Sequence, residues 1–211
     1  MRLAYDAFCA EGERLVDLSQ RAAQHSPVAE WRWRHGNRAH LPGNAFLVST
    51  ANDDEAVLPA TPATTAEDCG RSTETVVCEF HVVFHVVYQT PVLYFRAARL
   101  DGSLFPIAYH ISMLQLPGSR IGAVVVASME EHPVLGTPFW FLHPCETAAA
   151  MELLVKLQHA TVDRTPNSKD IDAVPAYLLS WLSLVAPLTG ISPLDYVGVS
   201  GGSERELAAT A

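Results

Sequence analysis

Cys145 is the residue of this sequence with the clearest capacity for covalent chemistry. It closes an apolar run and directly follows His143-Pro144. A helix is predicted over residues 148–158 with Thr147 as its N-cap, and the N–H groups and dipole at a helix start stabilise a thiolate. His143 is near enough along the chain to pair with the thiol. A single cysteine is also common as a buried packing residue, so local features leave both interpretations open.

Two histidines, His81 and His85, have the spacing of a metal-binding pair on a helix. The surrounding alternation predicts a strand instead, which separates the two rings by roughly 13 Å at ~3.3 Å per residue. They are therefore expected to line the wet face of a sheet, and no metal or cofactor is predicted. Residues 198–202 match the G-x-S-x-G hydrolase motif. No histidine follows His159 and only nine residues follow the motif, so we reject that assignment.

The cysteine pattern indicates a reducing compartment. The four cysteines show no C-x-x-C pair and no tight spacing, which argues against a zinc site or a disulfide framework: Cys9, Cys69, Cys78 and Cys145. The first twenty residues contain several charges and no signal-peptide core. The longest apolar segment, residues 177–191, is too short for a membrane span and contains Pro187 and Gly190. We expect a cytoplasmic protein with reduced thiols.

Composition predicts one globular domain over residues 1–211. Hydrophobic residues make up 49% of the chain and charged residues 18%, and the formal net charge is −9. An acidic chain of this kind is not expected to bind nucleic acid as its main partner, because phosphate recognition needs a basic face. Trp31-Arg32-Trp33-Arg34 is accordingly interpreted as a half-buried strand rather than a base-stacking platform. Residues 51–75 are acidic and contain prolines, which predicts a flexible loop, and residues 198–211 are expected to be a disordered tail.

The strongest strand signal covers residues 76–88. Alternate residues from Val76 to Tyr88 are apolar and predict a core face, whereas the other face is mixed and partly wet: Val77, Glu79, His81, Val83, His85 and Val87. A second strand over residues 92–96 is followed by the turn pair Asp101-Gly102, which predicts an antiparallel meander.

Helices complete the expected architecture. The apolar spacing of Ala4, Phe8, Leu15, Leu18 and Ala22 predicts a helix over residues 3–24, to which Glu11 is an exception. Further elements are expected at residues 45–49 (strand), 106–116 (short helix), 121–127 (short strand) and 177–185 (helix). The order of helix, meander, cysteine loop and helices is typical of an α+β domain with helices flanking an antiparallel sheet.

Three segments together resemble one known family. They are Glu131–Phe139 followed by Leu142-His143-Pro144-Cys145, the block Tyr88–Ala97 with Leu100-Asp101-Gly102, and Tyr177–Val185. The sequence is similar in these segments to the ubiquitin-like-conjugating enzymes of autophagy, the family of autophagy-related proteins ten and three. The two segments with His-Pro-Val-Leu-Gly and Pro-Val-Leu-Tyr-Phe-Arg favour the branch of protein ten. Residues 117–127 match the family poorly.

The resemblance implies a ubiquitin-conjugating-type fold and an acyltransferase whose catalytic nucleophile is Cys145. It implies that Cys145 takes a modifier (autophagy-related protein twelve) as a thioester from an activating enzyme (protein seven). An acceptor lysine, on autophagy-related protein five, then attacks to form an isopeptide bond. The alternatives are a conjugating enzyme that joins a modifier to phosphatidylethanolamine, a catalytically inactive binding module of the same fold, and, more distantly, a cysteine hydrolase.

One group that ordinary ubiquitin-conjugating enzymes carry is missing. Their His-Pro-Asn motif supplies an asparagine for acyl transfer, whereas here His132-Pro133 is followed by Val134 and His143-Pro144 by Cys145. The negative oxygen that forms during acyl transfer must therefore be stabilised by another donor. The candidates are a backbone N–H near Cys145 or the side chains of Ser128, His132 or His143.

Overall fold

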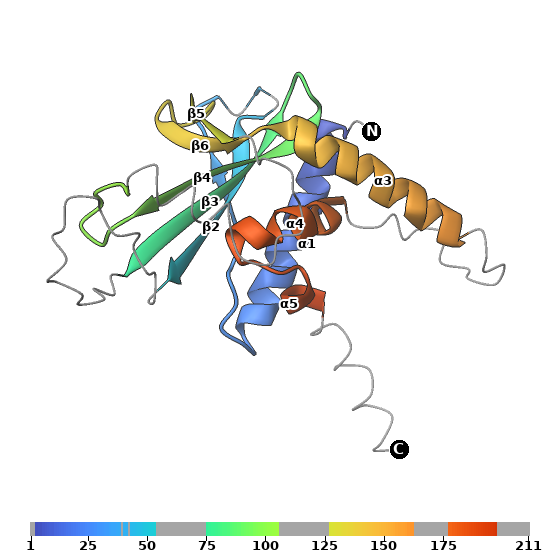
Figure 1. Cartoon of the computed structure of the whole chain (residues 1–211), viewed down its shortest axis with the longest axis horizontal. Helices are drawn as coiled ribbons and strands as arrows, with labels where there is room; N and C mark the ends of the chain where they lie inside the picture. Colours follow the sequence, from blue (N-terminus) through green and yellow to red (C-terminus); the bar gives the residue numbers. More distant parts are fainter. Residues whose placement is uncertain are drawn as a thin grey trace, which may run out of the picture.

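The computed structural model describes residues 3–38, 40–41, 43–53, 75–105, 127–162 and 177–197. Within them the elements follow in the order α1 (Tyr5–Ala23), β1 (Arg32–His35), β2 (Ala45–Asp53), β3 (Val76–His85), β4 (Thr90–Ala98), β5 (Ala127–Glu131), β6 (Pro138–Leu142), α3 (Pro144–Val162), α4 (Tyr177–Thr189) and α5 (Leu194–Val197). This is the α+β arrangement that the sequence predicts, with helices beside an antiparallel sheet (Figure 1).

The six strands form one sheet in the order β1-β2-β3-β4-β6-β5, and every neighbouring pair is antiparallel. Strands β1 to β4 make the expected meander. The β5–β6 hairpin then joins its far side, where Tyr94 of β4 lies opposite Phe141 of β6. Gly102 adopts the left-handed conformation at φ 84°, as the predicted Asp101-Gly102 turn requires.

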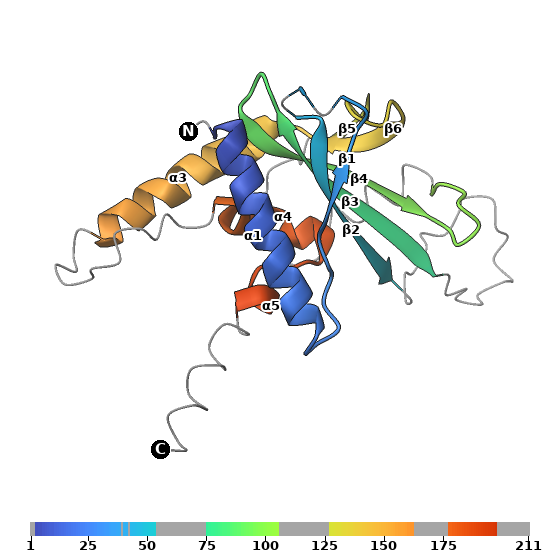
Figure 2. The same cartoon turned by 180° about the vertical axis from the view of Figure 1, so that it is seen from behind.

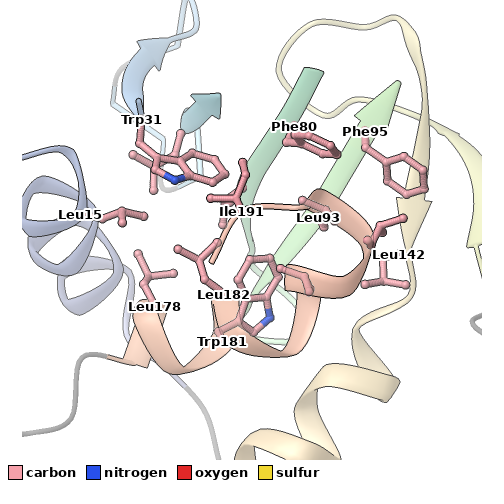
Figure 3. Packing of buried hydrophobic residues seen from close by; sticks show 14 of the residues in the cluster. Leu15, Trp31, Phe80, Leu93, Phe95, Leu142, Leu178, Trp181, Leu182 and Ile191 are labelled. Carbon is pink, nitrogen blue, oxygen red and sulfur yellow. The ribbon is translucent and has the colours of Figure 1, made fainter. Parts of the chain in front are cut away.

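Helices α1 and α4 cover one face of the sheet, α5 packs against α1, and α3 starts beside β4 and runs outward (Figures 1 and 2). Figure 3 shows the main core between these layers, where Leu15 of α1 and Trp181 and Leu182 of α4 face the strands. Phe80, Leu93 and Phe95 form the sheet side of this core. Each fully buried side chain of this size contributes about 1.5–3 kcal/mol through the apolar area it removes from water.

Helix α1 departs from the simple stripe in two informative ways. Ala4 is exposed, whereas Gly12 is buried, because the Trp33 ring of β1 occupies the space that a Cβ at position 12 would need. Glu11, the exception to the apolar pattern, accepts a 2.7 Å hydrogen bond from the backbone N–H of Leu178. It thereby satisfies one of the unpaired donors at the start of α4.

The expected wet face of β3 is wrong for its central part. His81 and Val83 are buried, because the far side of the sheet carries a second apolar cluster: Phe46, Val83, Val92, Tyr94, Phe139 and Phe141. The strand also ends at His85. Val86 and Tyr88, predicted to face the core, are exposed in the turn that joins β3 to β4. Periodicity alone could not reveal that a hairpin from further along the chain would cover one face of β3.

The region before and after Cys145 is more regular than expected. Residues 127–131 and 138–142 form strands that the sequence did not predict, and α3 begins at Pro144 rather than at residue 148. Thr147 therefore lies inside the helix, where its hydroxyl donates to the carbonyl of Pro144 at 3.2 Å, and is not the N-cap.

Several predictions fall on undescribed parts of the chain. They concern the short helix at residues 106–116, the strand at 121–126, residues 198–202 and the tail at 198–211. The same holds for most of the acidic segment 51–75, although its first three residues belong to β2 and pair with β3.

Candidate active site at Cys145

The end of β6 and the start of α3 place Cys145 at the surface. Pro144 occupies the first helical position, where its missing N–H costs nothing and its fixed φ suits the helix. His143 precedes it, and its ring nitrogen Nδ1 accepts the backbone N–H of Cys145 at 3.2 Å. His143 thus acts as the N-cap of α3. The thiol of Cys145 is exposed at this helix start, as the interpretation as a nucleophile requires.

The same ring nitrogen lies 2.7 Å from Sγ of Cys145. Because a backbone N–H can only donate, Nδ1 of His143 presents a lone pair on this side and can also accept the thiol proton. Transfer of that proton would produce an imidazolium next to a thiolate, which is the usual way in which a histidine activates a cysteine. The pairing of His143 with the thiol that the sequence suggested is therefore present.

Two aromatic rings flank His143, one from the β3–β4 turn and one from β6. Tyr88, in the β3–β4 turn, packs edge-on with a centroid distance of 5.8 Å, and Phe141 of β6 lies at 6.1 Å in a similar geometry. The His85 ring contacts the Tyr88 ring at a centroid distance of 4.6 Å in a tilted geometry, and His85 accepts the Tyr88 backbone N–H at 3.3 Å. Burial lowers the pKa of His85, which favours its neutral form. The sequence left the location of His85 and Tyr88 open, and both lie beside the candidate site.

His81 and His132 are engaged elsewhere. Both are buried, and Nε2 of His132 lies 3.1 Å from Nδ1 of His81. Nδ1 of His132 accepts backbone N–H groups of Val134 and Leu135. Both ring nitrogens of His132 are therefore occupied, which removes it from the candidates for stabilising an oxyanion. The sequence offered one signal for this arrangement. Glu79 and His81 are two residues apart on one strand, and such residues lie on the same face of a sheet.

Ser128 also points to another partner. Its hydroxyl donates to a carboxylate oxygen of Glu130 on the same strand at 3.1 Å. His143, by contrast, contacts Cys145, with Nδ1 2.7 Å from Sγ. The remaining donors are His143 and the backbone N–H groups in the first turn of α3.

No group of three or more histidine, cysteine or acidic side chains is arranged to hold a metal ion within the described residues. His81 and His85 in particular face different neighbours. In the same part of the chain, none of the helices has both the length and the apolar character needed to cross a bilayer.

A groove of about 290 Å³ adjoins the site on the sheet face opposite the main helices. Its lining includes Val83, Val92 and Tyr94 of the sheet together with Pro133 and Val134 of the β5–β6 turn. His85, Val86 and Val87 of the β3–β4 turn also line it, and the next residue, Tyr88, contacts His143. The groove therefore reaches the segment that packs against the site.

Comparison with known sequences and structures agrees with this geometry. The chain is 35% identical over 146 residues to the ubiquitin-like-conjugating enzyme ATG10 of Homo sapiens, covering 64% of this chain and 59% of that protein. It is 32% identical over 127 residues to the ATG10 of Dictyostelium discoideum, covering 57% and 54%. The chain thus spans somewhat more than half the length of these curated relatives.

A crystal structure of an autophagic E2, Atg10, shares the fold. The two structures superpose with a TM-score of 0.50 over 90% of this chain and 98% of the other, at 12% sequence identity. The sequence model described as autophagocytosis associated protein, active-site domain, matches residues 7–196. That match includes both His-Pro pairs, the sheet and Cys145, and the chain belongs to this family of autophagocytosis-associated active-site domains.

Proposed function

We propose that this protein is a ubiquitin-like-conjugating enzyme that carries a modifier as a thioester on Cys145 and transfers it to a lysine. The observation that carries the proposal is an exposed thiol at a helix start, 2.7 Å from a histidine nitrogen, in a chain of this family. The names of the relatives support the same activity.

In the first step Cys145 loses its proton to Nδ1 of His143, and the thiolate attacks the thioester carbonyl that links the modifier to the activating enzyme. A new carbon–sulfur bond forms, and the activating enzyme's cysteine leaves as a thiolate and takes up the proton. The modifier is then held on Cys145 as a thioester. A thioester suits this task because it reacts readily with amines.

In the second step a neutral lysine amine attacks the thioester carbonyl. The tetrahedral intermediate carries a negative oxygen, and its collapse breaks the bond to Sγ of Cys145 and leaves an isopeptide bond. The proton lost by the amine passes to the departing sulfur. The loss of one donor to such an oxygen costs ~3 kcal/mol in acyl-transfer enzymes. Backbone N–H groups at the start of α3 and the His143 ring are the donors we assign to this oxygen.

The resemblance to the branch of protein ten supports autophagy-related protein twelve as the modifier, protein seven as the activating enzyme and a lysine of protein five as the acceptor. Residues 1–211 would then act as one catalytic domain. A cytoplasmic location is part of the proposal, because the chemistry needs Cys145 as a reduced thiol. Conjugation to phosphatidylethanolamine and an inactive binding role are the alternatives.

Incubation of the protein with activating enzyme, ATP and each candidate modifier tests the proposal. The wild type should form a reductant-sensitive adduct with one modifier, and Cys145→Ser should form a reductant-stable oxyester instead. Cys9→Ser, a partly buried thiol on α1, serves as the matched control and should behave as the wild type. No adduct in wild type or Cys145→Ser would establish the inactive binding module, and an adduct with the lipid-directed modifier alone would establish conjugation to phosphatidylethanolamine.

A further inference from the structure

The second His-Pro pair, His132-Pro133, organises the turn between β5 and β6. Nδ1 of His132 accepts the backbone N–H groups of Val134 and Leu135, each at 3.2 Å. The turn is closed by the N–H of His132 donating to the Thr137 carbonyl and by the N–H of Gly136 donating to the His132 carbonyl, both at 2.8 Å. Gly136 has φ 66°, which a residue with a side chain rarely adopts. One buried ring thus fixes the backbone of this turn.

The proton positions in this cluster follow from its geometry. Because backbone N–H groups can only donate, Nδ1 of His132 carries no proton and Nε2 must carry one. That proton is donated to Nδ1 of His81 at 3.1 Å, so His81 carries its own proton on Nε2. Nε2 of His81 then donates to Oε1 of Glu79 at 2.8 Å. Nε of Arg96 donates to the other oxygen of Glu79 at 2.6 Å.

These hydrogen bonds give each histidine a single ring proton. The formal charges of the cluster are on Glu79 and Arg96. Burial lowers the pKa of His132 to about 3. The hydrogen bond from His81, with the Arg96 guanidinium behind it, lowers the pKa of Glu79 to about 2. The hydrogen bonds hold each ring of the cluster in one tautomer, so the cluster is a fixed support.

The support faces the active site through two sets of contacts. Tyr94 contacts the His132 ring at a centroid distance of 5.0 Å, Phe141 contacts Tyr94 at 5.0 Å, and Phe141 contacts His143 at 6.1 Å. The turn residues Pro133 and Val134 also line the groove whose other lining residues lead to Tyr88. Both sets of contacts end at the ring beside Cys145.

We propose that His132 is a positioning residue for the chemistry at Cys145, and that Glu79 and His81 hold its ring in the one tautomer that this role allows. Its orientation resembles that of metal-bound or catalytic histidines, whose second nitrogen is held by a carboxylate or another fixed partner. Here the carboxylate acts through an intervening histidine. The inference about transfer rates depends on the proposed function, whereas the inference about thiol reactivity does not.

Two substitutions test the hydrogen bonds of the two His132 ring nitrogens separately. In His132→Asn the amide oxygen lies near the position of Nδ1 and can still accept the turn N–H groups, but nothing reaches His81. In His132→Gln the longer amide can reach His81 but leaves the turn N–H groups without their acceptor. The measurements are the site-specific alkylation rate of Cys145 by iodoacetamide as a function of pH, and the single-turnover transfer from the thioester to a lysine amine.

We expect His132→Gln to slow transfer on the order of 10-fold to 100-fold, as for a reacting group displaced by about 1 Å. The loss should appear in the rate at saturating amine and not in the amine concentration that gives half that rate. The pH profile of Cys145 alkylation should shift in the same variant, whereas His132→Asn should keep most of both properties. Equal rates and profiles in wild type and His132→Gln would overturn the proposal, and so would equal losses in the two variants.

Glu79→Gln provides a second test if His132→Gln does not fold. It keeps the shape of the side chain but removes the anion that orients His81, so a smaller loss in the same direction is expected. Glu131→Gln, an exposed carboxylate on β5, is the matched control and should leave both readouts unchanged. An unchanged Glu79→Gln would count against the proposal. If the wild type forms no thioester, the proposed function fails, and the alkylation profiles alone still decide whether His132 positions the thiol.

Discussion

The two His-Pro pairs of this protein have the same local geometry and opposite surroundings. In each, Nδ1 of the histidine accepts the backbone N–H of the residue two positions later, past the proline: Val134 for His132 and Cys145 for His143. His132 directly follows β5, in the turn before β6, and lies in a buried cluster. His143 directly follows β6, next to an exposed thiol. A proline has no N–H, so the histidine ring meets the first available donor beyond it.

The difference between the pairs lies in what surrounds each ring. The second nitrogen of His132 is held by His81, and burial keeps the ring neutral. His143 is only partly buried, and its Nδ1 contacts a thiol that can release a proton. We therefore expect the same dipeptide to be a structural support in one place and a base in the other. Tertiary burial decides which role it takes, and the following predictions test that distinction.

The largest effect is expected for His143→Asn. Asparagine is a strong N-cap and can still accept the Cys145 N–H, but it cannot take the thiol proton. Formation of the Cys145 thioester should slow by about 10²–10⁴-fold, the usual contribution of a general base, while stability changes little. Single-turnover loading measures the rate, and thermal unfolding measures the stability. An unchanged rate of thioester formation would show that His143 only caps α3. The two His-Pro pairs would then both have structural roles.

His132→Ala should have the opposite profile, with a loss of stability as its first effect. The substitution empties a buried ring site and leaves the turn N–H groups and His81 without their partner, which should cost about 3 kcal/mol. His143→Ala should cost about 1 kcal/mol, as for the loss of an N-cap. Urea unfolding of both variants gives the comparison. Equal losses would mean that burial does not separate the two sites.

Acidification should weaken the fold through His132. Its pKa is about 3 in the folded protein against 6.5 in the unfolded chain, so below 6.5 the unfolded chain binds a proton that the folded protein does not. The contribution of neutral His132 to the free energy of unfolding is fully present above pH 6.5. It is lost as the pH falls towards 3, by about 1.4 kcal/mol per pH unit for one proton. Glu79, with a folded pKa of about 2 against 4.5, adds a further loss below 4.5.

The measurement is urea unfolding of wild type and His132→Asn across this pH range. Because the variant lacks the titrating ring, the difference in unfolding free energy between the two proteins should shrink as the pH falls. His85, whose pKa is also lowered, is present in both proteins and cancels. A difference that does not change with pH would contradict a buried neutral His132.

The smallest effect is expected for Tyr88→Leu. The Tyr88 ring packs edge-on against His143, a contact of the kind that contributes ~0.5–1.5 kcal/mol beyond its buried area. Its loss should raise the mobility of His143 and leave His132 unaffected. Proton resonances of the two imidazole rings, followed by NMR, report both sites at once. A shift at His132 of similar size would show that the two sites are less independent than their surroundings suggest.

Much of the fold could be predicted because its patterns are local. The alternation in β3, the Asp101-Gly102 turn and the spacing of α1 each depend on neighbours a few residues away. The short strands β5 and β6 were missed for a physical reason. Five-residue strands with three prolines in and around the hairpin carry little periodic signal, and they form because β4 offers an edge to pair with.

The candidate site also contains some contacts that the local sequence indicates and others that form only on folding. Cys145 and its neighbour His143 are two residues apart, so their proximity was evident from the order of the residues. The contact between His81 and His132 joins positions 51 residues apart, and no local pattern contains it. The face of β3 that carries Glu79 and His81 was expected to be wet because its residues are mixed in polarity. One hydrogen bond of these polar groups joins His81 to Glu79 within β3, and the others come from His132 in the β5–β6 turn and from Arg96 of β4.

The order of the residues alone indicated a thiol beside a histidine at position 145, a helix after it and an antiparallel sheet before it, because each depends on covalent neighbours and short-range periodicity. The tertiary structure decided which histidine stays exposed beside the thiol and which is buried as a support. Burial of a polar ring requires partners that satisfy both of its nitrogens, and such partners can be brought together only by folding.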